Sequence, residues 1–132
     1  MIGVDTNVLV RFFVRDDPRQ GSLADRFMNE RTSDDPAFIS VIVVAEFVWA
    51  LEQVYNYQRS QIHAALALLL GSANVVLERE ELVKTALMSA GEASSDIADS
   101  LIAALANDAG ASATVTFDRD AAKLVPGMEL LK

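Results

Sequence analysis

The sequence predicts an α/β fold, a three-layer α/β/α sandwich built on a mainly parallel sheet of about five strands. Three observations support this prediction. Short apolar segments alternate with longer amphipathic segments along the chain. Ser, Thr and Asp residues stand where helices would begin, and glycines follow several predicted helices. No repeat or linker interrupts the pattern, so the 132 residues are expected to form one domain, 1–132.

Five short apolar segments are predicted to be strands: residues 1–4, 37–39, 75–77, 113–117 and 128–131. Helical segments separate them, and a crossover helix is the usual connection between parallel neighbours. Ligands of such sheets bind beyond the carboxyl ends of the strands. Side chains that directly follow a strand are therefore the first candidates for a site.

The first helix is expected from Thr6 or Asn7 to about residue 14, with Arg11 and Arg15 on one face. Asp17 before Pro18 predicts the start of a second helix, to about residue 30.

Ser40 predicts the start of a third helix, to about residue 54, which is apolar on nearly all sides and so is expected to be well buried. A fourth is expected from Ser60 to Gly71, and a fifth over 80–90, ended by Gly91. Ser94 or Ser95 would cap a sixth, to about residue 108, and a helical turn should follow Asp118.

Composition excludes several classes of protein. Half of the residues are apolar, which indicates a packed globular chain. The absence of cysteine excludes disulfides, thiol nucleophiles and cysteine-bound zinc. No apolar run reaches the roughly 18 residues of a membrane span, and the first residues resemble a strand more than a signal peptide. A cytoplasmic location is expected.

The charge distribution is uneven. The formal net charge is −8, which disfavours long-range attraction to nucleic acid. No Lys or Arg occurs over residues 32–58 or 85–118. Five arginines precede the first gap: Arg11, Arg15, Arg19, Arg26 and Arg31.

Four acidic residues stand in unusual settings. Asp5 and Asp118 each follow a predicted strand, Glu46 interrupts an apolar helix, and Asp99 lies on a helix inside the second basic-free gap. Three of them also have an ordinary structural explanation, because Asp5 and Asp118 suit helix caps or turns and Glu46 suits a solvated gap in the apolar surface. If the four converge, they form a cation site.

Asp96 lies three residues before Asp99, about 60° around the helix. A place in the first turn, where the helix dipole favours acids, explains Asp96 better than Asp99. This face also carries small or short side chains, which would let a ligand approach closely: Ser100, Ala103, Ala106 and Asn107.

Other catalytic arrangements are missing. His63 is the single histidine, which excludes paired-histidine cleavage of RNA, and we expect it to be a surface or packing residue. No Gly-x-Ser-x-Gly elbow or Walker-type phosphate loop is present. Hard oxygen ligands remain, and these suit Mg²⁺ or Mn²⁺ and the hydrolysis of phosphodiesters. The early arginines would then hold flanking phosphates.

The chain resembles PIN-domain ribonucleases, and within them the VapC-type toxins of toxin–antitoxin pairs. The resemblance lies in four segments, in the order and spacing of that family: residues 2–9, 39–49, 96–106 and 116–120. In these segments stand Asp5-Thr-Asn, Glu46-Phe-Val-Trp, Asp96-Ile-Ala-Asp99 and Thr116-Phe-Asp118.

The resemblance implies a Mg²⁺- or Mn²⁺-dependent endoribonuclease that leaves a 5′-phosphate and a 3′-hydroxyl. The family's four metal-binding and catalytic acids would be Asp5, Glu46, Asp99 and Asp118. Auxiliary roles are expected for Thr6, Asn7, Asp96 and Thr116, and RNA binding for Arg11, Arg15 and Arg119. The implied partners are RNA, a small antitoxin protein and a second copy of the chain in a homodimer, with no membrane.

Two other readings stay open at this point. A phospho-receiver domain also gathers acids around Mg²⁺, but it needs adjacent acids after its first strand, and here Asp5 is followed by Thr6. A non-catalytic PIN-like module that binds RNA or a protein partner is the second.

Overall fold

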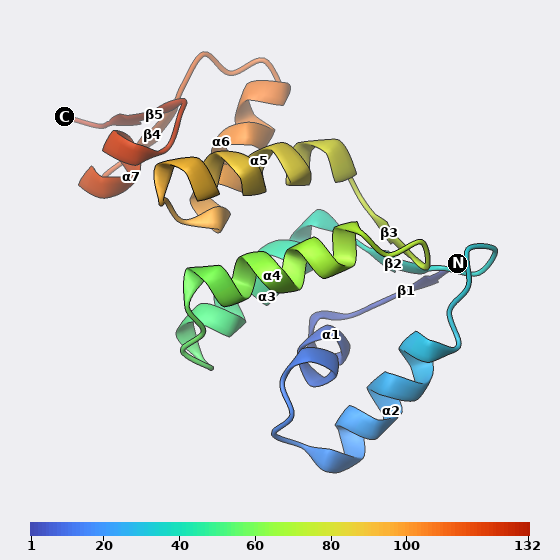
Figure 1. Cartoon of the computed structure of the whole chain (residues 1–132). Helices are drawn as coiled ribbons and strands as arrows, with labels where there is room; N and C mark the ends of the chain where they lie inside the picture. Colours follow the sequence, from blue (N-terminus) through green and yellow to red (C-terminus); the bar gives the residue numbers. More distant parts are fainter. The chain divides into compact units, whose positions relative to one another are not determined.

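The computed structural model describes all residues from Met1 to Lys132. The chain divides into two compact units, unit 1 (Met1–Glu80) and unit 2 (Glu81–Lys132). Figure 1 labels the elements of both units. None of the helices is both long enough and apolar enough to cross a lipid bilayer. That residues 1–132 act as one domain stays a prediction.

Unit 1 contains a three-stranded parallel sheet with β2 (Ala37–Ile39) between β1 (Ile2–Gly3) and β3 (Val75–Leu77). Ala37 lies opposite Ile2 on one side and Val75 on the other. Two of the three residues of β2, Ala37 and Ile39, are fully buried. β2 is therefore the centre of this sheet.

Four helices complete unit 1: α1 (Thr6–Phe13), α2 (Pro18–Asn29), α3 (Val41–Gln53) and α4 (Arg59–Leu70). α1 packs against α2 and α3, and α3 packs against α4 (Figure 1). Phe47 of α3 is fully buried, and its ring centroid lies 5.2 Å from that of Phe13. The apolar interior includes Leu9, Val44, Leu51, Ile62 and Leu66.

Unit 2 contains all but the first residue of α5 (Glu80–Ala93), together with α6 (Ile97–Asp108), β4 (Thr114–Thr116), α7 (Arg119–Leu124) and β5 (Met128–Leu130). β4 and β5 pair in parallel, with Thr114 opposite Met128. α7 connects them and packs against both (Figure 1). Its buried apolar cluster joins α6 to this connection through Ala103, Ala121, Val125 and Met128.

The predicted α/β class is confirmed, because helices alternate with five short strands and every strand pairing is parallel. Each strand lies within its predicted segment. The strands form sheets of three and two, each inside one unit.

The start and end of α1 differ from the prediction. Asp5, and not Thr6 or Asn7, is the N-cap, since its carboxylate accepts the N–H of Thr6 at 2.8 Å. The helix ends at Phe13, and Val14 is extended. Arg15 therefore lies outside the helix, and the prediction that it shares a helical face with Arg11 is wrong. The chain leaves the helix here because Asp17 must be extended before Pro18 to cap α2.

Helix boundaries further along also differ. α4 begins one residue earlier than predicted, where the Gln58 N–H donates to Gln61 Oε1 at 2.8 Å. α5 runs through Gly91 to Ala93, and its end is followed by Ser94 in the left-handed region at φ 54°.

The N-cap of α6 is Asp96, and neither Ser94 nor Ser95. The Asp96 carboxylate accepts the Asp99 N–H at 3.2 Å, and a negative charge is favoured at a helix N-terminus. Ser95 is buried instead, with its Oγ 3.4 Å from that of Ser100.

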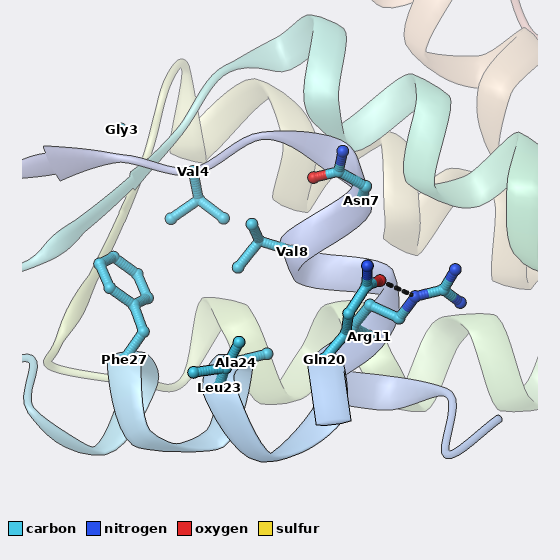
Figure 2. A pocket seen from close by; sticks show the side chains of 9 residues that line it. All are labelled: Gly3, Val4, Asn7, Val8, Arg11, Gln20, Leu23, Ala24 and Phe27. Carbon is cyan, nitrogen blue, oxygen red and sulfur yellow. Dashed lines mark hydrogen bonds between the residues drawn. The ribbon is translucent and has the colours of Figure 1, made fainter. Parts of the chain in front are cut away.

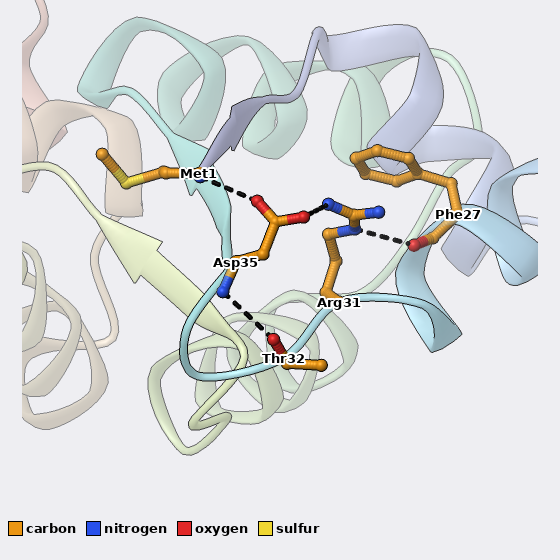
Figure 3. A network of polar contacts seen from close by, with 5 residues as sticks. All are labelled: Met1, Phe27, Arg31, Thr32 and Asp35. Atoms are coloured by element: carbon orange, nitrogen blue, oxygen red, sulfur yellow. Dashed lines mark hydrogen bonds and ion pairs between the residues drawn. The ribbon is translucent and has the colours of Figure 1, made fainter.

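A polar network joins the first residue of the structure to the turn before β2 (Figure 3). Asp35 accepts from the Met1 amine at 2.7 Å and from Arg31 at 2.8 Å. The buried Arg31 also donates to the Phe27 carbonyl at 3.1 Å, and its guanidinium lies 4.5 Å from the centroid of the Phe27 ring. The hydrogen bond from the Met1 amine is the main cause that lowers the pKa of Asp35, and Arg31 adds to it.

We predict that Asp35→Asn lowers the melting temperature at neutral pH. A carboxyl whose pKa is lowered by folding stabilises the protein above its ordinary pKa of 3.8 and loses this effect as the pH falls through the lower folded value. Melting curves of Asp35→Asn and wild type should therefore converge in acid. Asp34→Asn, an exposed neighbour, is the control and should match wild type throughout. A constant difference at all pH values would contradict the assignment.

Candidate active site

Asp5 follows β1 after one residue, Val4, beyond the carboxyl end of the strand, and is exposed. Its Oδ1 accepts the Thr6 N–H and caps α1, so its plain reading as a cap is correct. Oδ2 makes no hydrogen bond in the structure. The carboxylate therefore has a fixed orientation and one oxygen available for a ligand.

Thr6 Oγ1 is buried and has no hydrogen-bond partner. An unsatisfied buried hydroxyl costs about 1–3 kcal/mol, so such groups are rare in folded proteins. This one stands next to Asp5 in the chain. It is the observation that most directly indicates a ligand or an ordered water at this place.

Glu46 lies on the outer face of α3, and the expected burial of this helix holds only for the side that carries Val44, Phe47, Val48 and Leu51. Phe47 and Val48 face the interior, while Ile42 and Trp49 are 70% and 60% exposed. Glu46 makes no hydrogen bond or ion pair. Because it is exposed, desolvation does not force it to find a cation, and its candidacy depends on position alone.

In unit 2, Asp118 follows β4 and is exposed. Its Oδ1 accepts the N–H groups of Asp120 and Ala121 at 2.9 and 3.0 Å, which caps α7. The Asp118 N–H in turn donates to Thr116 Oγ1 at 3.0 Å. Thr116 thus holds the backbone of Asp118, as an auxiliary residue would.

Asp99 lies in the first turn of α6 and is half-buried, with its N–H bound by the Asp96 carboxylate. Asp96 is the cap of this helix, which confirms its plain reading. The neighbouring small side chains do not form an open face, since Ser100 and Ala103 are buried. They line a hollow of about 290 Å³ together with Thr85 and Ser89 of α5.

The structure divides the predicted acids between the units. Asp5 and Glu46 belong to unit 1, and Asp99 and Asp118 to unit 2. Neither unit by itself gathers three or more acidic or histidine side chains around one point. The convergence of all four therefore stays a prediction.

A comparison with protein families decides the class of this chain. The model of the PIN domain family matches residues 2–125. The chain belongs to the PIN domain family. The match contains all four candidate acids of this PIN domain and confirms the resemblance found in the sequence. It also removes the phospho-receiver alternative.

Other comparisons give less. The PIN domain is similar to the solved structure of VapC20 from Mycobacterium tuberculosis, described as a toxin that cleaves the sarcin–ricin loop, with 22% sequence identity and a TM-score of 0.47. The similarity covers 93% of this chain and 94% of that chain. The comparison with curated proteins finds no match.

Two of the three predicted RNA-binding arginines have partners inside unit 1. Arg11 donates to Gln20 at 2.7 Å, Asp16 at 2.9 Å and Tyr55 at 3.3 Å. The hydrogen bond to Tyr55, together with the charge of Asp16, raises the pKa of Arg11.

Arg15 donates to Asp25 at 2.6 Å, and this hydrogen bond raises its pKa. Arg11 and Arg15 therefore hold the connection between α1 and α2. Arg119 is exposed at the start of α7, next to Asp118 in the chain, and has no ion pair. Of the three arginines predicted to bind RNA, Arg119 is the one without an ion pair.

Sequence reasoning missed a cleft of about 410 Å³ beside β1, lined by α1 and α2 (Figure 2). Val4, Val8 and Phe27 give it apolar walls, and Asn7 and the Arg11–Gln20 pair supply polar groups. Leu23 and Phe27, four residues apart on α2, were the available signal, since they present apolar side chains on one helical face.

The capping role of Asp118 predicts different effects for two substitutions. Asp118→Asn keeps an oxygen that accepts both N–H groups, and Asn and Asp are similar N-caps, so we expect little change in stability. Asp118→Ala removes both hydrogen bonds and should cost about 1 kcal/mol of unfolding free energy. Urea unfolding measures both. Equal loss in the two variants would show that the charge, and not the cap, stabilises this turn.

Proposed function

We propose that this PIN domain is a divalent-metal-dependent endoribonuclease that hydrolyses RNA phosphodiester bonds, and that it is the VapC-type toxin of a toxin–antitoxin pair. The family match over residues 2–125, a span that includes Asp5, Glu46, Asp99 and Asp118, carries the proposal. Asp5 and Asp118 support it by their place at the carboxyl ends of parallel strands, where α/β proteins bind ligands.

The residues fit a hard divalent cation such as Mg²⁺ or Mn²⁺. The proposed ligands Asp5, Glu46, Asp99 and Asp118 offer carboxylate oxygens, which these ions prefer. Asp5 and Asp118 each commit only one oxygen to backbone N–H groups, and the buried Thr6 hydroxyl beside Asp5 has no partner. When bound, the cation would lower the pKa of a water molecule and neutralise charge on the phosphodiester.

The protein's own groups would orient the reactants. Backbone N–H groups fix the carboxylates of Asp5 and Asp118, and Thr116 fixes the backbone of the latter. Such fixed carboxylates need no reorganisation when substrate binds. Arg119, exposed beside Asp118, would hold a flanking phosphate. The net charge of −8 would otherwise repel RNA, which explains why a cation is needed.

We predict that purified protein, free of any antitoxin, cleaves structured RNA in Mg²⁺ or Mn²⁺ and not in EDTA. The products should carry 5′-phosphate and 3′-hydroxyl ends. Asp5→Asn, Glu46→Gln or Asp99→Asn should abolish cleavage without lowering the melting temperature, because like charges would repel each other in the metal-free protein if the four acids converge as proposed.

Glu129→Gln, which removes an exposed charge outside the proposed site, is the matched control and should cleave as wild type. Cleavage that persists in EDTA, or full activity in all three variants, would refute the metal-nuclease proposal. A variant that loses both fold and activity would indicate a structural role for that acid.

A non-catalytic module that binds RNA or a protein partner is the second candidate. It is favoured by the N-cap hydrogen bonds of Asp5, Asp96 and Asp118, because these give the three acids a structural role that needs no metal. Tight binding of RNA with no cleavage under any metal condition would support it.

The toxin role predicts a genetic result. Expression of the chain alone should arrest growth, and co-expression of the neighbouring upstream reading frame should relieve the arrest and co-purify with the chain. Asp5→Asn should be harmless while it still binds that partner. Harmless wild-type protein that cleaves RNA in vitro would separate the nuclease from the toxin proposal. The homodimer and the cytoplasmic location stay predictions, which sedimentation and cell fractionation test.

A further inference from the structure

Trp49, the one tryptophan of the chain, lies on the surface of α3 with 60% of its area exposed. Its neighbours in the chain, Phe47 and Val48, are buried, and the ring contacts of unit 1 join Phe12, Phe13 and Phe47. The core of unit 1 is thus complete without the indole. A single exposed apolar side chain is common on protein surfaces, so only its position can indicate a function.

Trp49 lies next to Glu46 on the surface of α3. Ile42, Glu46 and Trp49 are spaced i, i+4 and i+7, which places them along one face of α3, and all three are exposed. Residues three apart on a helix have Cβ atoms about 5–6 Å from each other. An exposed indole therefore stands one turn from an unpaired carboxylate that we propose as a metal ligand.

We propose that Trp49 is a stacking platform for an unpaired nucleobase of the RNA, beside the phosphate that is cleaved. The inference rests on the proposed nuclease function, because that function places a phosphate near Glu46. A base attached to the sugar next to that phosphate lies within reach of a side chain one helical turn away. Aromatic side chains bind single-stranded nucleic acid in this way, since every base has a π face.

The charge of this face favours stacking over phosphate binding. Residues 32–58 contain no Lys or Arg, so α3 has no cation of its own for the RNA backbone. Stacking needs no charge and is not weakened by salt as ionic contacts are. Trp49 would supply binding free energy where the acidic residues supply none.

The same face is poorly suited to a protein partner. Glu46 lies between Ile42 and Trp49, so a partner or second copy that covered both apolar side chains would bury an unpaired carboxylate. Burying such a charge is costly, and the centres of protein interfaces are depleted of charged residues. When hydrated RNA binds together with a divalent cation, the Glu46 carboxylate can still coordinate that cation.

The single tryptophan allows a direct test by fluorescence. Wild-type protein is titrated with a short single-stranded RNA, and with an abasic ribose-phosphate chain of equal length, in Mg²⁺ and in EDTA. We expect the RNA to quench Trp49 emission, more strongly in Mg²⁺, and the abasic chain to leave it unchanged. Equal quenching by both chains would overturn the proposal, because charge and not stacking would then be sensed.

Variants give a second measurement. Trp49→Ala should weaken RNA binding by about 5- to 150-fold, the range found for removal of an aromatic stacking residue, and Trp49→Phe should retain most of the affinity. Leu68→Ala is the control, since Leu68 is a large apolar side chain of α4 that is 68% exposed. It should bind RNA as wild type. Unchanged affinity in Trp49→Ala, or equal loss in Leu68→Ala, would overturn the proposal.

Three further outcomes separate the proposals. Trp49 emission that shifts with protein concentration and is insensitive to RNA would assign this face to a second copy and overturn the stacking role. Base-dependent quenching without any cleavage would support stacking and refute the nuclease function. Cleavage of RNA without base-dependent quenching would refute the stacking role alone.

Discussion

Parallel pairing of β2 with β1 and β3 is the constraint on which unit 1 depends. β2 is short, but its buried residues bring both neighbours to the same register, so the carboxyl ends of the strands share one edge. Asp5 and Ser40 follow β1 and β2 at this edge, and each caps the helix that leaves it. Strand pairing thus places the first candidate acid and begins α3, which carries Glu46 and Trp49.

Helix caps also explain how this chain tolerates carboxylates without basic partners. Asp5, Asp96 and Asp118 each bind backbone N–H groups at a helix N-terminus, where the helix dipole favours negative charge. The basic-free gaps of the sequence are therefore compatible with a stable fold before any cation binds. A capping carboxylate is held rigidly and keeps a second oxygen, so a structural role and a ligand role do not exclude each other.

For the arginines of unit 1, the sequence pattern suggests one role and the contacts in the structure show another. Their concentration before residue 32 suggests a surface for phosphates. Arg11, Arg15 and Arg31 instead bind Asp16, Asp25 and Asp35 within unit 1 and hold its turns together. These acids lie close to the arginines in the chain, so the guanidinium groups form ion pairs inside the unit and not with an outside phosphate. Of the three arginines proposed to bind RNA, only Arg119, in unit 2, has no ion pair.

The sequence by itself determined the alternation of strands and helices and several caps, such as Asp17 and Ser40, because these depend on neighbouring residues. The parallel pairing followed from the helical crossovers between successive strands, and the family from four segments spread along the chain. Only the tertiary structure decided that Glu46 and Trp49 are exposed and that Ser95 is buried. It also formed the cleft lined by α1 and α2. These features depend on which surfaces meet, and an apolar helix such as α3 does not specify which of its sides an adjacent helix will cover.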